Sequence, residues 1–192
     1  MDIKYLTERN FKVTRYQKGA VIYSPHQQPR YVYFVKSGEV RMVTVNDDGK
    51  EFVQGTFKSK QYFGEPALLL KRPYLAYTIA SKDTELILVD KQDFLKLLNE
   101  NREFSMDLIY TLSDRLFYKS MMLEELGNEH AEHRLLTLIK YLSADLDSGQ
   151  VLDVTRQALA DRCGLRVETV IRIIKKLEDN AEIKLINGKI VK

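Results

Sequence analysis

The segment from Thr155 to Leu177 constrains the fold more than any other part of this 192-residue chain. Thr155 is a good N-cap for a helix, and Ala160 is small, as a residue must be where two helices cross closely. Gly164 follows four residues later and can adopt the positive φ of a tight turn. The segment therefore predicts two helices joined by a tight turn, a helix-turn-helix.

The second of these helices is expected to have one buried face and one face that can reach DNA. The expected buried residues follow the i, i+3, i+4, i+7 spacing of an amphipathic helix: Val170, Ile173, Ile174 and Leu177. At about 100° per residue, Glu168, Arg172 and Lys175 point away from that stripe. On a recognition helix such side chains read base edges in the major groove, where arginine pairs with guanine and glutamate accepts from cytosine. Ile171 lies beside them, within reach of a thymine methyl group.

The same face could instead be a solvated surface that makes no contact with DNA. Glu168 and Arg172 are four residues apart and could form a solvated ion pair worth about 0.2–0.5 kcal/mol. The neighbouring sequence favours DNA binding instead, because the segment 183–191 contains two strand-like runs around Asn187-Gly188, a strong hairpin turn. Such a hairpin after a helix-turn-helix predicts a wing.

Charge and cysteine content restrict the classes of function. From Thr155 to Lys192 nine Lys and Arg stand against five Asp and Glu, a local charge of +4 that modestly favours a polyanionic partner. The single cysteine, Cys163, cannot form an internal disulfide, an iron–sulfur centre or a structural zinc site. We expect Cys163 to be a small core residue, with redox sensing as the less favoured alternative.

The remaining bulk features point to a cytoplasmic protein that is not an enzyme. No run of about 18 apolar residues is present, so no membrane-spanning helix is expected. The first residues lack the apolar region of a secretion signal. The three histidines have no convincing metal spacing, and nothing resembles a nucleophile–base pair or a phosphate loop.

The first ninety residues predict short strands. They are rich in Val, Ile, Tyr, Phe and Thr, and turn signals such as Asp48-Gly49 separate the strand-like runs. The expected strands are Phe11–Tyr16, Val21–Tyr23, Tyr31–Val35, Glu39–Val45, Glu51–Thr56, Leu75–Ala80 and Glu85–Val89. Many short strands with frequent turns predict a small sandwich or barrel.

Helical periodicity begins at Lys91. The expected helices are a short one over Asp93–Asn99, a long one from Asn101 to about Leu126, and a third from Glu129 to about Leu146. Gly127-Asn128 interrupts the pattern and predicts a hinge.

The long helix carries a narrow apolar seam with alternating spacings of three and four. The seam consists of Ile109, Leu112, Leu116, Leu123 and Leu126, with Lys119 in the remaining position. A seam of this kind predicts pairing with a second copy of the helix, and so a homodimer. The alternative is a helix packed on its own barrel, a contact that Phe104, Leu108 and Phe117 could make in either case.

The order of these features resembles the cyclic-AMP receptor protein / fumarate-nitrate regulator (Crp/Fnr) family over nearly the whole chain. The matching landmarks are Lys18-Gly19 with Ile22-Tyr23, Tyr33-Phe34-Val35 with Ser37-Gly38, Asp48-Gly49-Lys50-Glu51, Phe63-Gly64-Glu65, the long helix, Asp153–Gln157 and Val167–Arg172. The resemblance implies an α+β chain with a β-roll sensor domain over residues 1–100, a dimerising helix over 101–127 and a winged helix-turn-helix over 128–192. It also implies a homodimer on palindromic double-stranded DNA, with RNA polymerase as the further partner to consider.

The resemblance also assigns DNA contacts residue by residue. Glu168 and Arg172 match the family's shared base-reading pair. Arg156, Gln157, Thr169 and Lys189 fall where members contact phosphate or backbone. Val167 stands where some members have an extra arginine, and we expect the neighbouring Arg166 to reach a phosphate instead. The rival interpretation is a sensor roll whose winged helix mediates only protein–protein contacts.

The chain departs from the family at the effector pocket. In nucleotide-binding members the Gly-Glu pair, here Gly64-Glu65, is followed by an Arg-Ser or Arg-Thr pair that holds the cyclic phosphate. Tyr74-Leu75 stands in that place, and neither side chain supplies the positive fork that a buried phosphodiester needs. Arg72 is two residues away, beyond Pro73, which fixes the local backbone. We therefore expect no useful affinity for cyclic AMP, and the family's iron–sulfur cluster is not expected without its N-terminal cysteines.

Three interpretations of the sensor stay open. By alignment, Lys119 and Ser120 fall where nucleotide-binding members present hydroxyls to the base. In the first, the Lys119 stem packs and its ammonium reaches solvent, Glu65 or another local carboxylate. In the second, an unidentified acidic effector lies between roll and helix, with Lys119 and Arg72 as its charge partners. In the third, an empty pocket is closed by Tyr74, Leu75 and the leucines at 68 to 70.

Overall fold

The computed structural model describes residues 6, 9–46, 49, 51–127 and 130–192. The chain forms two compact units, Met1–Leu112 and Ser113–Lys192. None of the helices over the described residues combines the length and apolar character that crossing a membrane requires.

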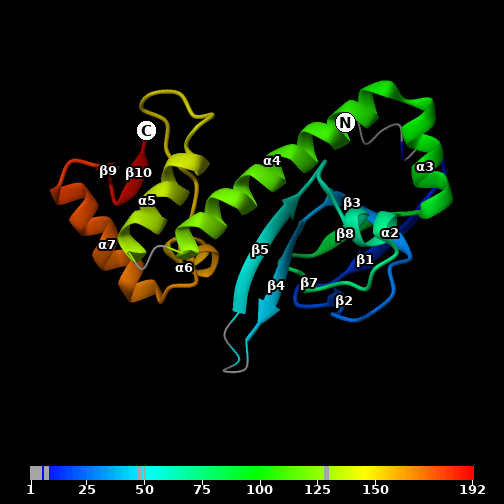
Figure 1. Ribbon diagram of the computed structural model, residues 1–192, viewed down its shortest axis with the longest axis horizontal. Helices are drawn as coiled ribbons and strands as arrows, with labels where there is room; N and C mark the ends of the chain where they lie inside the picture. Colours follow the sequence, from blue (N-terminus) through cyan, green and yellow to red (C-terminus); the bar gives the residue numbers. More distant parts are fainter. Residues whose placement is uncertain (1–5, 7–8, 47–48, 50, 128–129) are drawn as a thin grey trace. The chain divides into compact units, whose positions relative to one another are not determined.

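The first unit is a roll of two four-stranded antiparallel sheets, as the strand pattern predicted (Figure 1). The strand orders are β1-β8-β3-β6 and β2-β7-β4-β5. The strands are β1 Lys12–Tyr16, β2 Val21–Tyr23, β3 Tyr31–Ser37, β4 Glu39–Val45, β5 Glu51–Lys58, β6 Tyr62–Phe63, β7 Tyr77–Ala80 and β8 Thr84–Asp90. The β4–β5 hairpin is confirmed, with Gly49 donating its amide hydrogen to Asn46 O at 2.9 Å, whereas Asp48 lies outside the described residues.

Two short elements of the roll were not predicted. Strand β6 has two residues and helix α2, Glu65–Leu70, has six, so neither is long enough to show a periodicity. The expected strand from Leu75 begins only at Tyr77.

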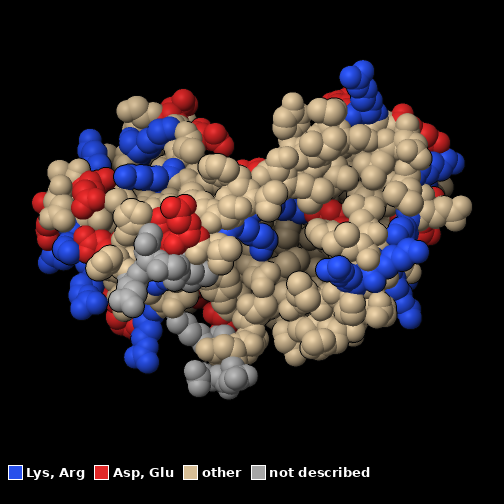
Figure 2. Space-filling model, in the orientation of Figure 1, with Lys and Arg blue, Asp and Glu red and all other residues tan. Residues whose placement is uncertain are grey.

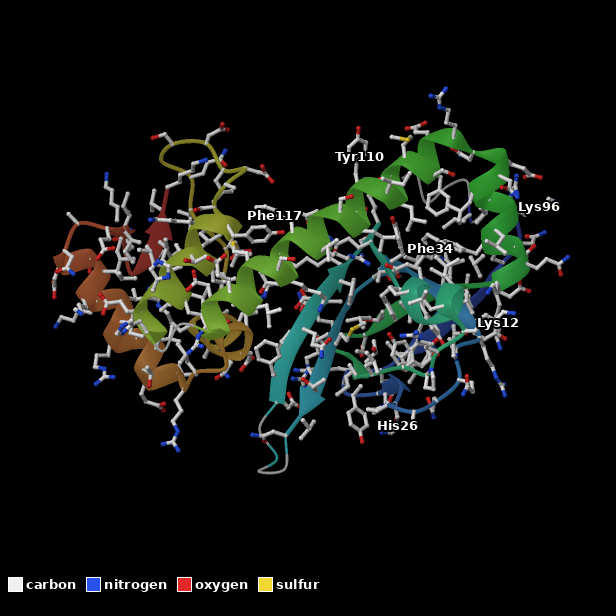
Figure 3. All side chains as sticks on the ribbon, in the orientation of Figure 1. Lys12, His26, Phe34, Lys96, Tyr110 and Phe117 are labelled. Atoms are coloured by element: carbon white, nitrogen blue, oxygen red, sulfur yellow. The ribbon has the colours of Figure 1, made fainter. Side chains whose placement is uncertain are left out.

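Helices α3, Lys91–Glu100, and α4, Arg102–Gly127, follow the roll. The Asp90 side chain caps α3 by accepting from the Asp93 amide at 2.9 Å. Phe104 and Leu108 of α4 join the buried cluster around Phe34, which Figure 3 shows inside the roll. The first turns of α4 are therefore a part of the roll's core.

The second unit contains the rest of α4 and four further elements with a common core: α5 Ala131–Leu142, α6 Arg156–Cys163, α7 Val167–Asp179, and the hairpin of β9 Lys184–Ile186 with β10 Lys189–Val191. Helix α4 contributes Tyr118, Met121 and Met122 to this core. Helix α5 ends earlier than predicted, where the Ser143 amide donates to Ile139 O; Glu129 and Asn128 lie outside the described residues.

Cys163 is confirmed as a buried residue of this core. Burial raises the pKa of its thiol to about 12, which keeps the sulfur protonated. The thiolate is the reactive form of cysteine, so this environment does not favour a redox sensor.

We expect Gly38→Ala to destabilise the roll. Gly38 has a φ of 88°, and an added Cβ would lie 2.4 Å from the backbone oxygen of Asp83. Gly19→Ala is the matched control, because its φ is 87° but no heavy atom lies within 4 Å of the added Cβ. The free energy of unfolding in urea should fall by about 1–3 kcal/mol more for Gly38→Ala than for Gly19→Ala. Equal losses would contradict the close contact.

Candidate nucleic-acid interface

The predicted helix-turn-helix is confirmed between Thr155 and α7. The Thr155 Oγ1 caps α6 by accepting from the Ala158 amide at 3.0 Å. Gly164 ends α6 with a φ of 65°, and the Leu165 amide then donates to Ala160 O at 2.9 Å. Ala160 is fully buried, in agreement with the close helix crossing. These contacts fix the direction in which α7 leaves the turn.

Helix α7 has the two faces that its sequence predicted. The stripe of Val170, Ile173, Ile174 and Leu177 is buried, whereas Glu168, Ile171, Arg172 and Lys175 are exposed. Glu168 and Arg172 are both among the described residues, and they do not form the ion pair that a purely structural role would give them. Both side chains are therefore available to an outside partner. Figure 2 shows Lys and Arg side chains along the edge of this unit near α7.

The wing follows α7 and is hydrogen-bonded to α6. Asn187 and Gly188 have φ of 49° and 74°, as a tight two-residue hairpin turn requires. Arg156 Nη2 donates to Gly188 O at 2.8 Å, and partial burial lowers the pKa of Arg156. Arg156, which was expected to contact a phosphate, is thus hydrogen-bonded to the turn of the wing. Lys189, the next residue after this turn, is exposed.

The other expected backbone contacts lie on α6 and at the start of α7. Gln157 is exposed but donates from Nε2 to Asp161 Oδ1 at 2.6 Å, within its own helix. Arg166 is exposed at the N-cap of α7, and Thr169 is half-buried one turn later. The start of α7 and the wing therefore present a basic, hydrogen-bonding surface.

The residues of the expected effector pocket that lie in the roll differ in burial. Gly64, with a φ of 89°, precedes α2, and Glu65 is fully buried. Tyr74 is 4% exposed and stacks on Tyr23 with ring centroids 3.6 Å apart. Leu75 is 85% exposed, so one residue of the Tyr74-Leu75 pair lies inside the roll and the other at its surface.

The third interpretation of the sensor is therefore only partly correct. Tyr74 and Leu68 are buried, but Leu70 and Leu75 are exposed and do not close a pocket. A hollow of about 400 Å³ lies beside the tyrosines, and Arg30 is the only ionic residue among the described residues that line it. Burial raises the pKa of Tyr74 to about 12, so its hydroxyl stays protonated and donates to Tyr31 O at 3.5 Å.

Lys119 and Ser120 lie on the part of α4 that belongs to the second unit, whereas Glu65 and Arg72 belong to the first. Both Lys119 and Ser120 are exposed. Partial burial, and the charge of Arg115 one turn earlier, lower the pKa of Lys119.

The predicted seam lies largely on an exposed face of α4. Leu116 is 67% exposed, and Ile109 and Leu123 are exposed too. Leu112 is half-buried against the roll's core, and the side chain of Leu126 lies outside the described residues.

Of the three residues that could contact the barrel, Phe117 does not share the position of Phe104 and Leu108. It is 67% exposed, whereas those two are buried. Nine residues at about 100° each place Phe117 half a turn away from Leu108. Tyr110 is exposed as well and projects from α4 in Figure 3. The seven-residue spacing of Tyr110 and Phe117 is the signal that places both beside the seam.

Comparisons with known proteins agree with this arrangement. Residues 13–101 match the cyclic nucleotide-binding domain, and residues 133–191 match the Crp-like helix-turn-helix domain. The transcriptional regulator ArcR of Staphylococcus haemolyticus is 30% identical over 188 residues, which cover 92% of this chain and 80% of that protein. The cyclic AMP receptor protein of Thermus thermophilus is 28% identical over 181 residues, 94% of this chain and 83% of that protein.

A solved structure shows the same fold. A CooA mutant from Carboxydothermus hydrogenoformans has a TM-score of 0.79 at 23% sequence identity, over 98% of this chain and 84% of that chain. This likeness extends over the roll, the long central helix and the winged helix-turn-helix. The chain belongs to the Crp/Fnr family of transcription regulators.

Proposed function

We propose that the protein is a transcription regulator that binds an inverted repeat as a homodimer and does not respond to cyclic AMP. The exposed pair of Glu168 and Arg172 on α7 carries the proposal, because neither side chain is bonded to another of the described residues. In this proposal the protein acts in the cytoplasm, and RNA polymerase is a further partner.

The reading face defines the expected DNA site. Arg172 reads a guanine, Glu168 accepts from a cytosine, and Ile171 contacts a thymine methyl group. We expect half-sites with a TGA-like core around a G·C pair, their centres about one helical turn apart. Arg166, Thr169 and Lys189 contact the phosphates on either side. Arg156 and Gln157 add backbone contacts at the start of α6, and Lys175 extends the reading face by a turn.

Arg172→Ala and Lys189→Ala are expected to have different effects on DNA binding. Arg172→Ala should cost about 1–3 kcal/mol on the preferred site and relax the preference at one base pair. Lys189→Ala should weaken all sequences alike and lower the slope of log affinity against log salt by about 1. Gel shifts with base-substituted sites at several salt concentrations measure both effects.

Two results of this experiment would count against the proposal. An unchanged site preference and affinity in Arg172→Ala would show that the reading face is wrongly assigned. Binding of no genomic fragment even at low salt would favour the rival function, a winged helix that contacts only protein.

The apolar face of α4 supports the homodimer. Its exposed members are Ile109, Tyr110, Leu116, Phe117 and Leu123. Each large apolar side chain gains about 1.5–3 kcal/mol from full burial, so a few paired residues outweigh the ordering cost of association. The occupant that fits a self-complementary seam is a second copy of the helix.

Leu116→Glu is expected to give monomers that no longer bind the inverted-repeat DNA site. The substitution places two like charges opposite each other in the seam. Leu95→Glu, at an exposed leucine of α3, is the control and should stay dimeric. Sedimentation at micromolar concentration measures both states, and a monomeric wild-type protein would contradict the proposal.

The interior of the roll argues against cyclic AMP as the effector. Tyr74 fills space beside Tyr23, and Leu75 faces solvent where a phosphate-binding side chain would stand. A buried phosphodiester without a charged partner is costly to desolvate. The hollow beside Arg30 leaves room for another small-molecule effector.

Calorimetric titration with cyclic AMP is expected to show no binding tighter than about 1 mM. The reason is the missing charged fork at Tyr74-Leu75. Micromolar or tighter binding would overturn this part of the proposal and leave the DNA-binding part standing.

A further inference from the structure

A buried acidic residue joins α4 to α5. Glu125, in the last turns of α4, is only 5% exposed. Its Oε2 lies 2.7 Å from Nδ1 of His133, and its Oε1 accepts from Thr137 Oγ1 at 3.0 Å. His133 and Thr137 are one turn apart on α5, so both oxygens of one carboxyl group are held by one helix face.

Helix α5 is attached to α4 at a second point. The Tyr141 hydroxyl donates to Asp114 Oδ1 at 2.9 Å, and the rings of Tyr141 and Tyr118 are 4.9 Å apart. Asp114 and Glu125 are eleven residues apart, about three turns of helix, so both lie on the same side of α4. The two attachments lie near opposite ends of α5.

Helix α5 is also attached to the recognition helix. Glu132, next to His133, forms an ion pair with Lys176 of α7, with Nζ and Oε2 2.5 Å apart. Leu135 and Ile139 of α5 share a buried cluster with Ile173 of α7. Figure 1 shows α5 between the end of α4 and α7.

These contacts limit rotation at the expected hinge. The two bonds of Glu125 run from α4 to α5 and so bypass Gly127-Asn128. A buried carboxyl group is costly when it loses a hydrogen-bond partner, because water cannot replace that partner. The side-chain arrangement around Glu125 therefore favours one orientation of α5 against α4.

We propose that Glu125 is a positioning residue for DNA reading, which acts through His133 and Thr137. It fixes α7 to the dimerising part of α4, so that α4 sets the distance between the two recognition helices of a dimer. This inference rests on the proposed function, since it assigns a role in binding an inverted repeat.

Spacing selectivity tests the proposal. Gel shifts would compare the preferred inverted repeat with sites in which one base pair is inserted or removed between the half-sites. The ratio of these affinities is the readout, because a smaller folded fraction lowers every affinity equally and leaves the ratio unchanged. The variants are Glu125→Ala and Glu125→Gln, with Glu124→Ala at the exposed neighbouring acid as the matched control.

In Glu125→Ala the ratio should fall by roughly tenfold, the size of a typical coupling between two sites. Glu125→Gln keeps a group that can bond to His133 and Thr137 and should restore most of the selectivity. Glu124→Ala should behave as the wild type. A weaker overall affinity of Glu125→Ala with an unchanged ratio would overturn the proposal, because Glu125 would then act only on stability.

Hydrogen–deuterium exchange separates this inference from the proposed function. If the wild-type protein bound no DNA, the proposed function would fail. The exchange rates of the α5 amides would still show whether Glu125 holds α5 against α4. Faster exchange in Glu125→Ala, but not in Glu124→Ala, would support an orientation held by Glu125. Equal exchange in both variants would overturn it.

Discussion

The burial of one stripe of α7 determines which side chains the helix offers to DNA in the proposed function. Val170, Ile173, Ile174 and Leu177 are buried in the core of the second unit, and each contributes on the order of 1.5–3 kcal/mol. Rotating the helix to bury another face would place Glu168 or Arg172 in an apolar core, at a much larger cost. The reading face is therefore a consequence of core packing, and the wing is held beside it through Arg156 and Gly188.

Helix α4 meets three environments along its length. Its first turns bury Phe104 and Leu108 in the roll, and its later turns pack the buried Met122 and the half-buried Tyr118 in the core shared with α5 and α6. The face between these contacts stays apolar and exposed, which is an unfavourable arrangement for a monomer and a suitable one for a dimer. The later turns of α4, which carry Leu116, Phe117 and Leu123 of this face, belong to the same compact unit as α7.

The roll matches the cyclic nucleotide-binding domain and has an aromatic interior. Aromatic rings occupy it: Tyr33 stacks on Phe63 with centroids 5.2 Å apart, and Tyr74 stacks on Tyr23. Burial raises the pKa of Tyr33, so its hydroxyl stays neutral. The shape of this domain depends on its strand pattern, whereas the choice of ligand depends on a few side chains such as Tyr74 and Leu75.

The sequence by itself determined the elements with a clear period or turn signal. The roll strands, the N-cap at Thr155, the turn at Gly164 and the two faces of α7 all depend on local spacing, and the structure agrees with them. Local spacing could not show which neighbour each face of α4 meets, so Phe117 remained a candidate for the contact with the roll. Tertiary structure alone turned Leu75 outward, bonded Arg156 to the wing and brought Glu125 to His133. These contacts join residues distant in sequence or depend on the path of a short loop, where no periodicity constrains a side chain.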